Sequence, residues 1–231
     1  MSADPDAPVL SRARLRRDSP VEALARLLVP DAPGARHGAA HSLVWALFAD
    51  GRDRRRDFLW REMRPGEFLI LSARPPSDPH GLFDLDSKPF DPALSRGQRL
   101  AFDLRANPVV SIPAQRGRRG KRRGLVAQTL QPIPPEARPA ARDGAIREAA
   151  AAWLGRKGAE AGFEIDAERL HLDGDEEIRI RRGENSAVTF SALTFLGVLT
   201  VQDPVLFLRS VARGFGAAKA FGCGLMLIRR A

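Results

Sequence analysis

Apolar and polar residues alternate along the first half of the chain in two different periods. Apolar residues at 9–15 alternate with basic ones, which is typical of a strand at the edge of a sheet. Residues 40–48 carry apolar side chains three and four positions apart and predict a helix. The other expected elements are a helix at 19–28, strands at 58–60 and 68–71, a loop over 74–96 with one short helix as an option, and an interrupted strand at 99–112. Together they predict one α+β unit in residues 1–113.

The second half repeats this mixture of elements and predicts a unit in residues 125–231. A helix over 143–157 would have Asp143 as its N-cap and would end at Gly158. Another helix would begin at Asp203-Pro204 and end at Gly214. Strands are predicted at 168–172, 176–182, 187–201 and 225–230. Helices on one face of an antiparallel sheet in each half favour an α+β fold of tandem ferredoxin-like (RRM-like) domains.

Positive charge is concentrated in four short runs. The chain of 231 residues has 37 Lys and Arg against 28 Asp and Glu, a net charge of +9. The runs lie at 12–17, 52–58, 116–123 and 179–182. A solvated surface explains any one run, but several together favour a polyanionic partner such as RNA or DNA. Residues 115–124 have no apolar side chain, so the segment 114–124 is predicted to be an exposed loop or linker between the units.

Cysteine content and the N-terminal residues restrict the cellular context. Cys223 is the single cysteine, so the chain has no internal disulfide, and it has no companions for a metal site. A small buried hydrophobic residue is the simplest interpretation of Cys223. The N-terminal residues lack a basic region followed by an apolar stretch, and no apolar run reaches the length of a membrane span. A cytoplasmic protein without a membrane partner is expected.

A glycine-rich segment, GFGAAKAFGCGLM, occupies residues 214–226. Glycine backbone can approach a ligand closely, and its amides can converge on phosphate oxygens. Lys219, in the middle of the segment, adds a positive charge. A phosphate-bearing ligand is one hypothesis, and simple turns after a helix are the alternative. No Ser or Thr follows Lys219 and the segment precedes a strand, so a nucleotide cofactor is not expected.

Histidines are the main candidates for proton transfer, because the chain has four histidines and no tyrosine. His37 and His41 are four positions apart and would share one face of a helix. Without a nearby carboxylate or cysteine this pair does not favour a metal site, and a half-buried histidine remains the alternative for His41. His80 and His171 have no chemical companion in the sequence. Aromatic residues make up 6% of the chain without an RNP1-like pair, so base stacking on an RRM platform is not supported.

Four segments spread along the chain carry a more specific signal. They are HSLVW at 41–45, RRDFLW at 55–60, FDLRANPVVS at 102–111 and the stretch from Gly197 to Met226 that contains the glycine-rich segment. In this order, and in a chain of this length, they resemble the CasE family, the precursor CRISPR RNA endoribonucleases of type I-E Cascade. The resemblance implies tandem ferredoxin-like domains, a CRISPR repeat RNA stem-loop as substrate, and other Cascade subunits as partners.

The resemblance also implies a mechanism. Members of the family cleave at the 3′ base of the stem-loop without a metal or another cofactor, through attack of the RNA 2′-hydroxyl, and leave 2′,3′-cyclic phosphate and 5′-hydroxyl ends. They then stay bound to the product hairpin. His41 matches the catalytic histidine of the family and would act as general acid or general base. Some relatives have a tyrosine where this chain has Gly38, so His37 is the hypothetical replacement.

Two groups of residues are then expected to bind RNA. The glycine-rich segment would hold the RNA backbone near the cut through Lys219 and the amides around Gly214, Gly216, Gly222 and Gly224. The basic segment would enter a groove of the stem-loop through Arg116, Arg118, Arg119, Lys121, Arg122 and Arg123. Two alternatives stay open: an RNA-hairpin-binding subunit that has lost cleavage, favoured by Gly38, and a basic scaffold protein.

Overall fold

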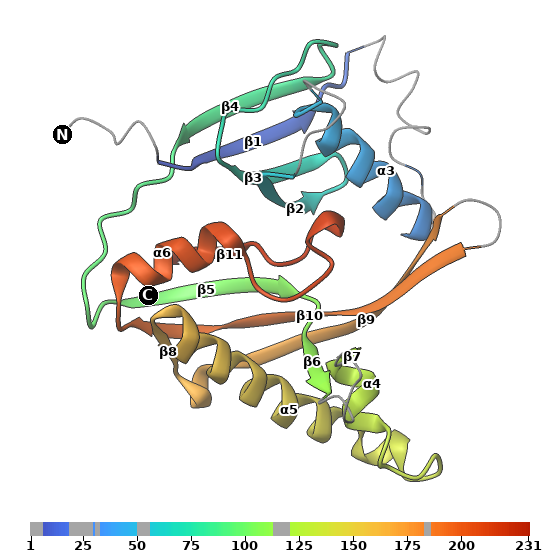
Figure 1. Cartoon of the computed structure of the whole chain (residues 1–231). Helices are drawn as coiled ribbons and strands as arrows, with labels where there is room; N and C mark the ends of the chain where they lie inside the picture. Colours follow the sequence, from blue (N-terminus) through green and yellow to red (C-terminus); the bar gives the residue numbers. More distant parts are fainter. Residues whose placement is uncertain (1–6, 19–29, 31–32, 50–55, 113–120, 183–185) are drawn as a thin grey trace.

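The structure, a computed structural model, describes residues 7–18, 30, 33–49, 56–112, 121–182 and 186–231. It contains two antiparallel sheets with helices, and the predicted α+β class is confirmed (Figure 1). The helix expected at 19–28 lies outside the described residues, as do residues 114–120 of the basic segment.

The first sheet has four strands in the order β2-β3-β1-β4, all paired antiparallel. These are β1 (Val9–Leu15), β2 (Phe58–Arg64), β3 (Glu67–Ser72) and β4 (Phe83–Pro89). The prediction of an edge position for β1 is wrong, because β3 and β4 flank it. Its basic residues fit an interior strand since they lie on one face only, where Arg12 pairs with Glu67 at 2.5 Å, while Ala13 on the other face is fully buried.

Strand β4 was not expected, since residues 74–96 were predicted to be a loop. The strand is mostly polar, and Phe83 is its one buried residue, so it gives no clear alternation. Backbone pairing with β1 along its whole length forms it instead. Residues 73–82, between β3 and β4, form turns and extended backbone where a ferredoxin-like unit would have its second helix.

Helix α3 (Pro33–Ala46) covers one face of the first sheet. The apolar residues that predicted it, including Leu43, Val44, Leu47 and Phe48, are buried in a cluster with Trp60 and Phe68, so this prediction is confirmed. The helix begins early enough to include both His37 and His41.

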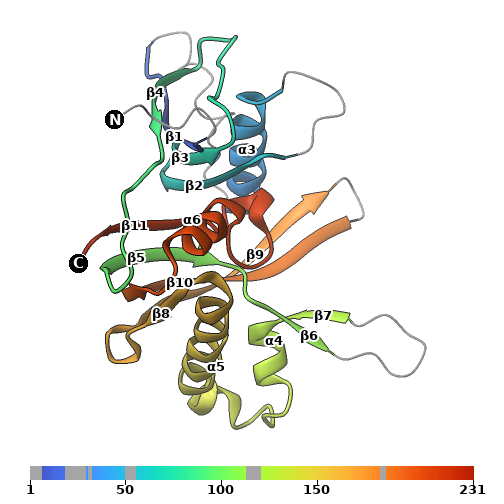
Figure 2. The ribbon, with the colours of Figure 1, turned by 60° about the vertical axis from the view of Figure 1, so that its left-hand side comes forward.

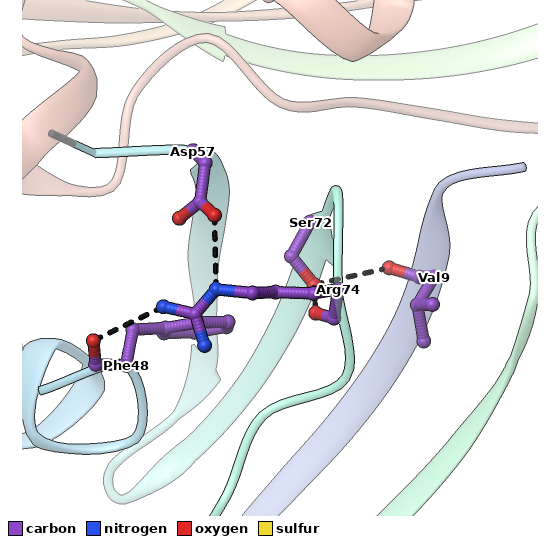
Figure 3. A network of polar contacts seen from close by, with 5 residues as sticks. All are labelled: Val9, Phe48, Asp57, Ser72 and Arg74. Carbon is purple, nitrogen blue, oxygen red and sulfur yellow. Dashed lines mark hydrogen bonds and ion pairs between the residues drawn. The ribbon is translucent and has the colours of Figure 1, made fainter. Parts of the chain in front are cut away.

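A polar network fixes the end of this helix to three strands (Figure 3). The guanidinium of Arg74 donates to Asp57 at 3.0 Å and to the carbonyl of Phe48 at 3.1 Å, and it lies over the Phe48 ring. The hydroxyl of Ser72 donates to the Arg74 carbonyl at 2.7 Å and lies 3.5 Å from the Val9 carbonyl oxygen. A cation that binds carbonyls just beyond a helix C-terminus stabilises that end, so the network holds α3 in place on the sheet.

The second sheet has the order β11-β5-β10-β8, with β9 also paired to β10. Its strands are β5 (Arg99–Ala106), β8 (Phe163–Ile165), β9 (His171–Arg182), β10 (Ser186–Val201) and β11 (Met226–Arg230). Both β8 and β9 pair with β10, one after the other, across a 3-10 turn, η1 (Ala167–Arg169), which replaces the start of the strand expected at 168–172. With helices α5 (Arg138–Ala161) and α6 (Pro204–Arg213), the chain follows the βαββαβ order of a ferredoxin-like unit.

The observed ends of α5 and α6 can be compared with the caps that the sequence predicts. Helix α6 is confirmed: the Asp203 side chain accepts from the Leu206 amide at 2.9 Å, and Gly214 follows the last turn. Helix α5 extends beyond its predicted bounds at both ends. Gly158 lies inside the helix, and Gly162 with φ 76° ends it. The glycine at 158 has a packing role instead, because a Cβ there would lie 2.6 Å from the Phe163 carbonyl.

Strand β5 lies in the second sheet, between β10 and β11, so its expected place in the first unit is wrong. After it, β6 (Val109–Ile112) and β7 (Lys121–Gly124) pair with each other, and a short helix α4 (Leu125–Leu130) follows. Residues 121–124 of the basic segment therefore pair with 109–112 between the first strand and first helix of the second unit, and the segment is not a linker between the sheets; we call the pair β6 and β7 the basic hairpin. Figure 2 shows β6 and β7 extending away from the second sheet.

The two units pack against each other through the face of the first sheet opposite α3. Leu59 and Leu71 on that face belong to the hydrophobic cluster of the second unit. Arg61 on β2 forms an ion pair with Asp103 on β5 at 2.6 Å. Apolar packing and a partly buried ion pair thus join the units. The chain that follows α6 also contacts α3.

Candidate active site and nucleic-acid interface

His41 of α3 is held by backbone from the far end of the chain. Its Nδ1 lies 2.8 Å from the carbonyl oxygen of Ala220, 179 positions away. A carbonyl oxygen can only accept a hydrogen bond, so Nδ1 carries the proton. In the neutral imidazole, Nε2 then has the free lone pair, and in the imidazolium it has the second proton. Nε2 is therefore the atom available for proton transfer.

Aromatic rings surround the imidazole of His41. The rings of Phe221 and Trp45 lie 5.4 Å and 6.0 Å from it, both tilted. The indole Nε1 of Trp60 donates to the same Ala220 carbonyl at 3.2 Å. His41 is itself only partly buried, so a ligand can approach an imidazole whose orientation is set by the protein.

His37 lines an open groove of about 330 Å³ at the junction of the two units. The groove is lined by Arg36, His37, Trp60, Arg61, Glu62, Arg105, Glu176, Phe221 and Gly222. Its arginines all face carboxylates: Arg36 with Glu62 at 3.8 Å, Arg61 with Asp103 at 2.6 Å and Arg105 with Glu176 at 2.5 Å. The groove is therefore polar but nearly balanced in charge.

The glycine-rich segment contains a 3-10 turn, η2 (Lys219–Phe221), packed against α3 and β2. All four glycines have positive φ. A Cβ at Gly216 would lie 2.6 Å from the Asn107 carbonyl, and one at Gly222 would lie 3.1 Å from the Trp60 ring. Glycine is therefore needed for the path and packing of the segment, independently of any ligand.

The amides of this segment mostly bond within the protein. Four of them donate to backbone carbonyls at 2.7–2.9 Å: the Gly214 amide to that of Ser210, the Phe215 amide to that of Gly224, the Ala217 amide to that of Asn107 and the Gly224 amide to that of Arg105. The expectation that the amides of Gly214 and Gly224 converge on phosphate is therefore wrong for this conformation. What the segment presents instead is the Ala220 carbonyl to His41.

Lys219 closes the end of α6, because its Nζ donates to the Arg213 carbonyl at 2.7 Å. Burial lowers the pKa of Lys219, and the charge of Arg56 lowers it further. Burial also lowers the pKa of the Arg56 guanidinium. Two half-buried cations that repel each other form a place where an anion would be stabilised. Sequence reasoning did not single out Arg56, because a charge run does not reveal which member is half-buried.

The basic hairpin lies elsewhere on the second unit. Lys121, Arg122 and Arg123 are exposed on β7, and Arg123 donates to Gln128 at 3.2 Å and to Gln131. Arg116, Arg118 and Arg119 lie outside the described residues. In both views α3 lies above the strands of the second sheet and β7 lies below them (Figures 1 and 2). A ligand that contacts both must span the second unit.

The other chemical candidates have structural roles or stand apart. Cys223 is fully buried, which raises its pKa to about 11, so its interpretation as a small buried residue is confirmed. His80 and His171 are exposed, away from His41 in sequence. Within the described ranges, His, Cys, Asp and Glu form no group of three that would suit a metal ion. No helix in the described part of the chain is long and apolar enough to cross a membrane.

Two features of the site were not found from the sequence. The Ala220 carbonyl has no side-chain signal at all, and Trp60 was noted only as part of a motif. Both lie next to residues that were found, since Ala220 follows Lys219 and Trp60 lies across from Gly222. Only the packing of the two units brings them to His41.

Comparisons of the sequence with known proteins identify a family of CRISPR-associated proteins. A family described as CRISPR associated protein matches residues 10–230. The CRISPR-associated endoribonuclease Cse3 of Thermus thermophilus is 31% identical, over 85% of this chain and 89% of that protein. The Cascade subunit CasE of Escherichia coli K12 is 29% identical, over 80% of this chain and 88% of that protein.

The fold gives the same result. A solved structure of the CRISPR endoribonuclease Cse3 bound to a 19-nucleotide RNA has a TM-score of 0.67 and 29% identity, and the match covers 96% of this chain and 98% of that one. Both sheets, α3 and the glycine-rich segment lie within the matched residues. The chain belongs to the Cse3/CasE family of CRISPR-associated proteins.

Proposed function

We propose that this chain is a metal-independent endoribonuclease that cleaves precursor CRISPR RNA at the 3′ base of the repeat stem-loop. The observation that carries the proposal is the imidazole of His41, which is accessible and fixed by a 2.8 Å bond from Nδ1 to Ala220. Membership of a family that includes an endoribonuclease and a Cascade subunit supports it. So does the fold shared with a relative that was solved with RNA bound.

The proposed reaction is an in-line transesterification. The RNA 2′-oxygen attacks phosphorus, its proton is removed, and the bond to the 5′-oxygen breaks as that oxygen gains a proton. The products are a 2′,3′-cyclic phosphate and a 5′-hydroxyl. Nε2 of His41 either accepts the first proton or donates the second, a contribution of about 10²–10⁴ in rate. The Arg56 and Lys219 cations would stabilise the charge that develops on the phosphoryl oxygens.

RNA binding in this proposal combines two surfaces of the chain. Lys219, on the turn of the glycine-rich segment beside α3, holds the RNA backbone near the cut through its charge. The basic hairpin grips the stem. Because the strands of the second sheet lie between α3 and β7 in both views, a stem-loop that contacts both spans the second unit. The chain then stays on the product hairpin as a Cascade subunit, and the CasE relative is by its description a Cascade subunit.

Replacement of Lys121, Arg122 and Arg123 together by alanine should weaken repeat binding by about 10- to 100-fold. Each lost phosphate contact removes a released counterion, so the slope of log K against log salt should fall by about 2–3. Filter binding at several salt concentrations measures both quantities. The matched control replaces three exposed arginines elsewhere, Arg209, Arg229 and Arg230. Equal losses in the two variants would contradict a specific role for the hairpin.

His37 is proposed to supply the second proton-transfer or orienting role, which a tyrosine at position 38 supplies in the relatives that have it. His37→Ala should lower the single-turnover rate about tenfold or more. Adding Gly38→Tyr to this variant should restore the rate, because a Cβ at Gly38 meets nothing within 4 Å. Gly38→Phe, which lacks the hydroxyl, is the control. A rate unchanged in His37→Ala would remove His37 from the mechanism.

The proposed function is tested by incubating the protein with its own repeat RNA in EDTA and examining the product ends. Cyclic phosphate and 5′-hydroxyl ends are expected at the 3′ base of the stem. Tight binding without cleavage would point to a hairpin-binding subunit that has lost activity, and weak binding without sequence preference would point to a basic scaffold protein.

A further inference from the structure

Two donors converge on one carbonyl beside the reacting imidazole. The Ala220 oxygen accepts from Nδ1 of His41 at 2.8 Å and from Nε1 of Trp60 at 3.2 Å. His41 and Trp60 come from different elements of the first unit, α3 and β2, whereas Ala220 comes from the second. The position of this carbonyl decides which imidazole nitrogen carries the resident proton.

The backbone around this carbonyl is held in a costly conformation. Ala218, just before the turn, has φ 53°, and among the described residues it is the one non-glycine residue with positive φ. Gly222, just after the turn, has φ 78°. A left-handed conformation is unfavourable for a residue with a Cβ, and it persists only where surrounding contacts enforce it. The turn therefore depends on what its groups bind.

The indole that binds the carbonyl is itself immobile. Trp60 is 1% exposed, and its ring meets Phe68 edge-on at a centroid distance of 5.7 Å. The position of a Cβ at Gly222 is only 3.1 Å from the ring, so the turn packs directly on it. A rigid donor can hold an acceptor at a fixed place with little loss of side-chain entropy.

We propose that Trp60 is a positioning residue for His41. Its indole N–H holds the Ala220 carbonyl where that oxygen accepts the Nδ1 proton, and this keeps Nε2 as the nitrogen that exchanges a proton with the RNA. Trp60 touches neither substrate nor reacting atoms in this role. The inference rests on the proposed cleavage by His41 and names the residue that selects its tautomer.

Trp60→Phe removes the N–H while keeping an aromatic ring, and Trp153→Phe is the matched control. Trp153 is also buried, at 2% exposed, and stacks on Phe195 in the core of the second unit. Its Nε1 has no acceptor in the part of the chain that the structure describes. Both variants lose similar ring volume, but only one loses a hydrogen bond at the site.

We expect Trp60→Phe to lower the single-turnover rate at saturating protein about tenfold, with RNA affinity unchanged, because a small misplacement of a catalytic group lowers the rate steeply. In ¹⁵N NMR spectra of the free protein, His41 should change from the pure Nδ1–H tautomer to a mixture. Trp153→Phe should keep both rate and tautomer. If Trp60→Phe behaves like Trp153→Phe, the inference is overturned.

The wild-type spectrum keeps the test decisive even if Trp60→Phe does not fold. A neutral His41 with its proton on Nδ1 supports the inference, and a proton on Nε2 overturns it. The same spectra separate this inference from the proposed function, because they need no RNA. Loss of cleavage in wild type would refute the function, whereas active wild type with an insensitive Trp60→Phe would refute only the positioning role.

Discussion

His41→Ala is expected to lower the cleavage rate by about 10²–10⁴ while leaving repeat RNA affinity unchanged. The imidazole exchanges a proton through Nε2 and contributes little to binding, whereas the cations that hold RNA lie on other residues. Single-turnover kinetics in EDTA, with binding measured on an uncleavable repeat that carries a 2′-deoxy substitution at the cut, separate the two quantities. A fall in rate without a fall in affinity identifies a catalytic group.

The controls for this variant are the exposed histidines. His80→Ala and His171→Ala remove an imidazole without touching α3, and both should cleave at the wild-type rate. If His41→Ala still cleaves within threefold of wild type, His41 is not the proton-transfer residue. If instead its affinity falls in proportion to its rate, His41 binds RNA and does not act in the chemistry.

Gly216→Ala is expected to destabilise the protein by about 2–4 kcal/mol, the sum of a positive-φ cost and a backbone collision. The residue has φ 78°, and its Cβ would lie 2.6 Å from the Asn107 carbonyl. That carbonyl also accepts from the Ala217 amide at 2.8 Å, so relief of the collision breaks this bridge. Thermal or urea unfolding of the whole chain measures the loss.

Gly81→Ala separates the two costs of that substitution. Gly81 also has positive φ, 65°, but a Cβ there would meet nothing within 4 Å. Its replacement should cost only the backbone term, about 1 kcal/mol. Equal losses at Gly81 and Gly216 would show that the close approach to Asn107 is relieved without cost, and that the glycine-rich segment is less tightly packed than the structure indicates.

Local patterns predicted the elements whose signals lie within a few residues. The apolar spacing at 40–48 places α3, because each of those side chains is buried by the helix period itself. The cap at Asp203 and the glycine after Arg213 define α6 for the same reason, since a helix end is satisfied by its own neighbours. His41 was found because its motif is local.

Partners in a sheet are a different matter, because alternation along one strand does not say which strand lies beside it. Residues 99–106 have a clear strand pattern, yet only tertiary pairing with β10 and β11 shows that they open the second unit. The sequence predicts a loop or linker for the basic segment for the same reason, since β6 before the segment and β7 at its end are short and pair only with each other. The position of the Ala220 carbonyl depends on a backbone conformation for which no side chain gives a signal in the sequence.

The bond between His41 and Ala220 also has a consequence for synthesis. A chain leaves the ribosome with its N-terminal part first, and domains generally fold as units in that order. The first unit, with its histidine, emerges long before residue 220, which is 179 positions later. A nascent chain would therefore carry the histidine without its tautomer being set, and we expect translation itself to postpone nuclease activity until the subunit is almost finished.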